Sequence, residues 1–105
     1  MATLTGSQRK HLRGLAHSTK PAVQIGKGGL TESVVQALDD ALESRELIKV
    51  KIAADRGERS EMVPLIEARL GCECVGEVGH MAILFRQHPD PEKRKVSVDT
   101  QNVER

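Results

Sequence analysis

Apolar positions along the N-terminal third follow first a helical and then a strand spacing. Leu12, Leu15 and Ala16 recur at helical intervals after a Thr5-to-Gln8 capping-box pattern, which predicts a first helix ending near His17. Apolar and polar residues then alternate over 22–25, which predicts a short strand. A second apolar stripe, following Thr31 as N-cap, predicts a helix that ends near residue 46.

Apolar and polar residues alternate again in the middle of the chain. In the strand predicted over 47–53, Lys49 and Lys51 occupy the face opposite the branched apolar residues, so both lysines point away from that side of the core. A third helical stripe follows. Ser60 is its predicted N-cap and Gly71 its C-cap, although Pro64 leaves the start of this helix open.

A hairpin and a polar tail complete the pattern, with strands expected over 72–78 and 81–86 around the turn at 79–80. The order α-β-α-β-α-β-β predicts a right-handed parallel crossover closed by an antiparallel hairpin. We therefore expect an α/β fold of two layers with a mixed four-stranded sheet. Residues 1–88 form the expected domain, and residues 89–105 a charged, flexible tail, because the sequence from Gln87 is too polar to pack.

The composition is that of a globular protein, with 38% apolar and 30% charged residues and Phe85 as the single aromatic. It offers no aromatic surface for stacking bases. The apolar runs are too short to span a bilayer, and residues 1–8 lack the features of a signal peptide, so we expect a cytoplasmic protein without a membrane partner. Cys72 and Cys74 alternate on one strand and cannot easily bridge each other, which fits a reducing compartment. No long apolar face is left over, so we expect a monomer.

Charge is unevenly distributed although the net charge is only +1. Residues 1–30 carry five basic side chains and no acidic one, whereas residues 31–48 carry five acids against Arg45. On the first helix, Arg9, Lys10, Arg13 and His17 fall on one side, opposite Leu15. This side is either a basic surface for a polyanion or an ordinary solvated helix face.

The glycine-rich stretch 26–29 lies between the first strand and the second helix. Helix N-termini leave backbone N–H groups unpaired and attract phosphate, and glycines allow close approach, so Gly28 and Gly29 are expected to present N–H groups with Lys27 beside them. Such contacts read no base. A P-loop would need glycine at Pro21, and a dinucleotide fingerprint would need glycine at Thr31. A tight turn without ligand remains the alternative.

Longer stretches are more specific than the glycine motif. They are KPAVQIGKGGLT (20–31), ELIKVKI (46–52), HLRGLAH (11–17), GH (79–80), LFR (84–86) and KRKV (93–96). Together they resemble the YhbY-like, or CRM-domain, family over nearly the whole chain. The resemblance implies a fold similar to the C-terminal domain of bacterial translation initiation factor three, and it makes 26–29 the family's RNA-contacting GxxG loop. Departures are the position of Pro64 and a long, acidic tail.

The resemblance also implies a role. Stand-alone bacterial members look like factors bound to precursors of the large ribosomal subunit, whereas plant proteins carry the domain in tandem for organellar intron splicing. A short chain of this kind therefore resembles the bacterial type, with ribosomal RNA and pre-ribosomal particles as partners and no cofactor. The candidate RNA-binding residues are Arg9, Lys10, Arg13, Lys20, Gly26, Lys27, Gly28, Gly29, Lys49, Lys51 and Arg86.

Three other functions are weaker hypotheses. Cys72, Cys74 and His80 could ligate a metal, but no second cysteine pair accompanies them and core cysteines are favoured. No nucleophile elbow or histidine–carboxylate grouping indicates an enzyme. The serious competitor is a protein-interaction module whose acidic second helix docks a basic ribosomal protein through Glu32, Asp39, Asp40 and Glu43.

Overall fold

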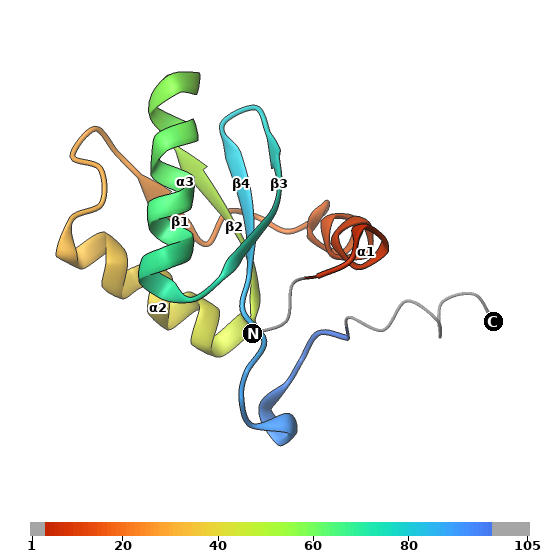
Figure 1. Ribbon diagram of the computed structural model, residues 1–105. Helices are drawn as coiled ribbons and strands as arrows, with labels where there is room; N and C mark the ends of the chain where they lie inside the picture. The colour runs from red at the N-terminus through yellow and green to blue at the C-terminus, as the bar shows by residue number, and fades with distance from the viewer. Residues whose placement is uncertain (1–3, 98–105) are drawn as a thin grey trace.

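The sheet has four strands in the order β1-β2-β4-β3, and the computed structural model describes residues 4–97 (Figure 1). β1 pairs with β2 in parallel, and β4 runs antiparallel to both β2 and β3. In chain order the elements are α1 (Gly6–Ala16), β1 (Val23–Ile25), α2 (Glu32–Arg45), β2 (Leu47–Ile52), α3 (Arg56–Leu70), β3 (Glu73–Val78), β4 (Met81–Phe85) and the 3-10 helix η1 (Pro91–Lys93). The α/β class, the order of the first seven elements and the mixed sheet are confirmed.

Helices cover both faces of the sheet, so the expected two-layer arrangement is wrong. In β4, Ala82 and Leu84 belong to the core under α2 and α3, whereas Ile83 and Phe85 belong to a second core under α1. Figure 1 shows α1 on the side of the sheet away from α2 and α3. β4 is apolar at consecutive positions because it is buried on both faces, which makes the domain three-layered.

The N-terminal helix begins where the capping box predicts. The Gln8 amide donates to Thr5 Oγ1 at 3.1 Å, and the Thr5 amide donates to Gln8 Oε1 at 2.8 Å. Leu12 and Ala16 are buried against the sheet. Leu15 was expected in the same stripe but is 46% exposed, so the buried face of α1 is narrower than predicted.

The third helix starts earlier than predicted. Its N-cap is Asp55, whose Oδ1 accepts the Glu58 amide at 2.8 Å, and Ser60 lies inside the helix. Aspartate at N-cap satisfies one of the free amides at the helix start, and it suits the positive end of the helix dipole together with Glu58. Pro64 therefore sits in the helix interior, on its exposed side, and Gly71 ends the helix in the left-handed region with φ of 61°.

The segment after β4 packs against the domain, contrary to the expectation for the sequence from Gln87. His88 is buried, and the buried Glu46 carboxylate accepts hydrogen bonds from the amides of His88, Lys95 and Val96. Val96 also packs against the core under α1. A polar segment can pack here because one carboxylate satisfies three of its amides. The rest of the predicted tail, 98–105, lies outside the described residues.

Candidate nucleic-acid interface

The glycine stretch forms a tight turn at the end of β1. The Gly29 amide donates to the Gly26 carbonyl at 3.1 Å, and this bond leaves Lys27 and Gly28 exposed at the tip. The Gly29 N–H, expected to face a ligand, instead closes the turn. Within residues 4–97, the amides of Lys27 and Gly28 have no hydrogen-bond partner. The turn therefore presents two adjacent N–H donors and one ammonium group.

Helix α2 follows the turn but does not begin at the glycines. Thr31 is its N-cap, with Oγ1 accepting the Val34 amide at 3.3 Å, and the helix starts at Glu32. Leu30 and Val35 both pack on the core beside this cap, as a hydrophobic staple does. The staple fixes the direction in which the chain enters the helix, and so it positions the turn.

The fold constrains the glycines of the turn to different degrees. Gly29 has a positive φ of 72°, which side chains other than glycine rarely adopt. A Cβ added to Gly26 would meet no atom within 4 Å, and a Cβ on Gly28 would lie at an ordinary 3.6 Å from the Thr31 methyl. The fold itself therefore leaves room for a side chain at 26 and 28, and glycine there keeps the backbone accessible.

Four of the predicted basic residues are available to a ligand. Within the described part of the chain, they are exposed and form no ion pair: Lys10, Lys20, Lys27 and Lys51. Lys51 on β2 is paired with Gln24 on β1, two positions before the turn begins. Of the two lysines of the sheet, Lys51 is therefore paired nearer to the turn. Lys49 is half-buried, with Nζ donating to the His17 carbonyl at 3.2 Å, and it joins α1 to β2.

The predicted arginines make contacts within the fold. Arg9 pairs with Glu73, and Arg13 donates from Nη1 to the Val75 carbonyl at 2.8 Å, so both tie α1 to β3. Basic residues on one side of α1 can bond to β3 because that side also faces the strand. The periodicity of the sequence does not distinguish a basic side that binds a ligand from one that bonds to a neighbouring strand.

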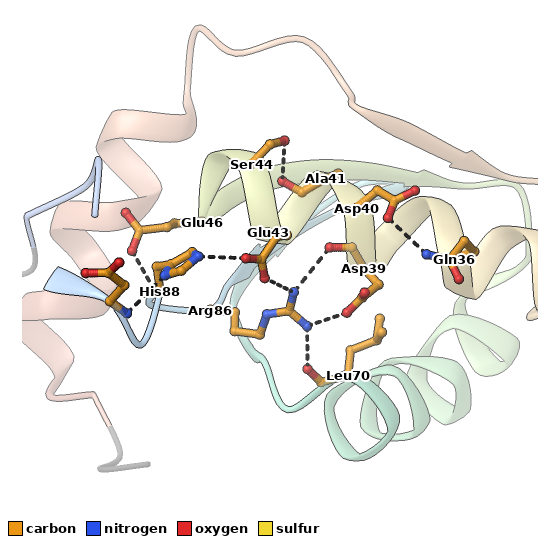
Figure 2. Close-up of polar contacts among 11 residues, drawn as sticks. Gln36, Asp39, Asp40, Ala41, Glu43, Ser44, Glu46, Leu70, Arg86 and His88 are labelled. Carbon is orange, nitrogen blue, oxygen red and sulfur yellow. Dashed lines mark hydrogen bonds and ion pairs between the residues drawn. The ribbon is translucent and has the colours of Figure 1, made fainter. Parts of the chain in front are cut away.

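Arg86, a predicted RNA contact, instead makes its contacts within the fold. Its Nη1 lies 2.8 Å from Asp39 Oδ1 and 3.0 Å from the Leu70 carbonyl, and Nη2 lies 3.7 Å from Glu43 Oε1 (Figure 2). Only 19% of its side chain is exposed. Arg86 thus joins α2 and the end of α3 to the segment after β4, and its guanidinium is not part of the candidate interface.

The acidic residues of α2 are largely paired within the chain, which weakens the protein-docking hypothesis. Glu32 pairs with Arg69 at 2.6 Å, and Asp39 and Glu43 face Arg86. Figure 2 also shows Glu43 against His88, at 2.6 Å, and Asp40 accepting from Gln36, at 2.9 Å. A basic partner would have to compete with these internal cations for the same carboxylates.

An open cavity of about 570 Å³ borders the turn at the edge where β1 and β2 end. The loop before α3, the start of α3 and the β3–β4 turn supply its other walls, and Figure 1 shows these segments at the same end of the sheet. Asp55, Glu58 and Met62 line it and were absent from the sequence-based site. The Asp55-to-Glu58 spacing is a helix-start signal that could have placed them at this edge.

Cys72 and Cys74 are free and lie on the same side of the sheet, as their spacing predicted, and this is the side under α2 and α3. Burial raises the pKa of Cys72 to about 12, which disfavours the thiolate that a metal would need. His80 stands at the β3–β4 turn, at the far end of β3 from both cysteines, where Nδ1 contacts Arg59 and the Ile52 carbonyl. The three residues are not grouped as a metal site.

Residues 4–86 match the family model described as the CRS1 / YhbY (CRM) domain. A Haemophilus influenzae protein named "RNA-binding protein" is 40% identical over 87 residues, covering 82% of this chain and 88% of the relative. The Pseudomonas aeruginosa "Probable RNA-binding protein PA4753" is 37% identical over 91 residues, covering 86% and 88%.

A solved structure is similar over nearly the whole chain. The solution structure of the hypothetical Staphylococcus aureus protein SAV1595, described as a candidate RNA-binding protein, has a TM-score of 0.77 and 34% sequence identity. The match covers 90% of this chain and 100% of that one.

No helix within residues 4–97 is long and apolar enough to cross a membrane.

Proposed function

Because the chain belongs to the CRS1 / YhbY (CRM) domain family, we propose that it is an RNA-binding protein whose 26–29 turn holds a backbone phosphate. The carrying observation is that the Lys27 and Gly28 amides have no partner among the described residues, at an exposed tip beside the Lys27 ammonium. Two N–H donors and a cation match a phosphate and read no base. The family is one of RNA-binding proteins without enzymatic activity, so the function that we propose is RNA binding without catalysis.

The proposed interface extends from the turn to the exposed lysines. Lys51 is its nearest member on the sheet in register, and Lys10 and Lys20 contribute further positive charge from the same basic N-terminal third of the chain. Lys27 is the central cation, since it belongs to the turn itself. Contacts of this kind give sequence-independent affinity that falls as salt rises.

The first test measures RNA affinity against salt for Lys27→Ala. If Lys27 meets a phosphate, the slope of log affinity against log salt should become shallower by about one. Lys93→Ala is the matched control, because it removes the same charge from an exposed lysine of η1, away from the turn (Figure 1). Equal slopes for both variants and the parent protein would reject phosphate binding at Lys27.

The second test changes the tip of the turn at Gly28. Gly28→Asp places a carboxylate beside the proposed phosphate, whereas Gly28→Asn adds a side chain of nearly the same shape without charge. A Cβ at position 28 makes only an ordinary contact, 3.6 Å from the Thr31 methyl. We expect the aspartate variant to bind RNA more weakly than the asparagine variant, most clearly at low salt. Equal affinities would mean that the phosphate lies elsewhere.

We also propose that the RNA is ribosomal and that the protein acts in the cytoplasm on precursors of the large subunit. This assignment rests on the family resemblance. Its test is a sucrose gradient of cell lysate at low and high salt, in which the protein should sediment with large-subunit precursors at low salt and be released at high salt. Sedimentation as free protein at low salt would overturn the ribosomal assignment.

A further inference from the structure

The lining of the cavity beside the turn combines two kinds of chemistry. Gly26, Lys27 and Gly29 belong to the turn of the proposed phosphate site, and Asp55 with Glu58 contribute carboxylates. The remaining lining residues are Ala53, Ala54, Met62 and His80. A phosphate is repelled by the carboxylates and attracted by Lys27, so a nucleotide would enter with its phosphate at the turn and its base inward.

The carboxylates keep acceptor capacity for a ligand. Asp55 Oδ1 accepts the Glu58 amide at 2.8 Å, and Asp55 Oδ2 has no partner within residues 4–97. The Glu58 side chain forms no ion pair with any described residue and is exposed. Ionised carboxylates only accept hydrogen bonds. A ligand in this cavity is therefore favoured when it offers N–H donors.

The cavity also has apolar surface and a suitable size. Ala54 and Met62 are half-buried, and the flexible thioether of methionine adapts to a flat ring. The volume of the cavity, about 570 Å³, lies within the range of small-molecule sites. Arg59 Nη1 donates to the carbonyl of one lining residue, Ala54, at 2.6 Å and lies 3.1 Å from Nδ1 of another, His80, so it links the loop before α3 to the β3–β4 turn.

We propose that this cavity holds one unpaired nucleobase of the bound RNA, with the Watson–Crick edge donating to Asp55 and Glu58. The proposal rests on the proposed phosphate-binding function and assigns base selection to a site beside it. Guanine fits best, because its ring N–H and amino group are adjacent donors for a carboxylate. Uracil fits worst, because it offers one N–H between two carbonyl oxygens that the carboxylates repel.

The experiment compares short single-stranded oligouridine with the same oligomer carrying one central guanosine. The parent protein should bind the guanosine oligomer about tenfold more tightly, the discrimination expected of a two-donor contact to a base. In the double variant Asp55→Asn with Glu58→Gln the preference should fall close to one. Asparagine is as good an N-cap as aspartate, so helix α3 should persist, which circular dichroism checks.

Lys27→Ala separates this proposal from the phosphate-binding function. It should weaken binding of both oligomers by the same factor and leave the guanosine preference intact. Equal binding of the two oligomers by the parent protein, or a preference that survives the double variant, would overturn the base site while leaving phosphate binding standing. Absence of binding to either oligomer, and to longer RNA, would instead overturn the proposed function itself.

Discussion

Glycine serves two separate needs in the 26–29 turn. The fold favours glycine at position 29, because its φ is 72°, whereas Gly26 and Gly28 have conformations and space that would accept a Cβ. The sequence motif treats the three residues alike. The structure separates the residue that shapes the turn from the two that keep its backbone open to a ligand.

This difference predicts opposite effects of two alanine substitutions. Gly29→Ala should lower the free energy of unfolding by about 1 kcal/mol, because alanine is strained in the left-handed region. Gly26→Ala should leave it nearly unchanged, since its Cβ meets no atom within 4 Å. Denaturant unfolding of both variants measures the effect. Similar losses for the two would show that the turn does not depend on the Gly29 conformation.

At the scale of elements, α3 shows how a helix boundary can be misplaced when two caps compete. Asp55 and Ser60 both have a residue type suited to N-cap, and Ser60 is the predicted one, with Pro64 leaving the start of the helix open. The observed helix begins at Asp55 and accepts Pro64 in its interior. Proline removes one amide donor, but Val63, Ile66 and Leu70 are all buried on the opposite side, and their packing compensates for that loss.

Pro64 should therefore be a site where a substitution stabilises the protein. Pro64→Ala restores the amide donor in an exposed position, and it should raise the free energy of unfolding by about 2 kcal/mol, after allowing for the greater freedom of the unfolded chain. Ala68→Pro is the opposite control, because Ala68 is also exposed and lies one turn after Pro64. This substitution should lower the free energy of unfolding. Loss of stability in Pro64→Ala would mean that the proline ring itself contributes packing.

At the scale of the whole molecule, Glu46 attaches the C-terminal segment to the domain. Burial raises the pKa of Glu46, but hydrogen bonds from the amides of His88, Lys95 and Val96 together lower it by more. The pKa of Glu46 therefore lies below its ordinary value of 4.5. Glu46 also has a positive φ of 67°, which glycine usually adopts at a helix end. The side chain offsets this strain by holding residues 88–96 in place.

Glu46 should make stability depend on pH. Because its pKa is lowered on folding, its ionised form stabilises the native state above pH 4.5, and this contribution is lost as the pH falls through the folded-state pKa. Glu46→Gln presents an N–H group to one of the three amides, so it should cost about 2 kcal/mol at neutral pH. The difference from the parent protein should shrink below pH 4.5.

Unfolding measured across this pH range tests the prediction, with Glu61→Gln as a control at an exposed glutamate of α3. The control should follow the parent protein at every pH. A gap between the parent protein and Glu46→Gln that stays constant into acid would show that the Glu46 charge does not attach the segment.

The sequence by itself determined the order of helices and strands, the first helix's capping box and the position of the glycine turn. These features follow from local rules, in which periodicity, caps and turn residues act over a few positions. It could not assign the third helix's start, because two local signals competed. Its similarity to a family supplied the expectation of RNA, which local patterns alone left open.

Only the tertiary structure decided which side chains remain free. Arg13 and Arg86 look like surface cations in the sequence, yet each bonds to a group more than ten residues away, and the polar segment 88–96 packs because Glu46 lies beneath it. The cavity beside the turn is likewise formed by the 26–29 turn, residues 53–62 and the β3–β4 turn, which are distant in the chain. Charge pairing and cavities depend on which distant residues meet, and a pattern of neighbouring positions does not contain that information.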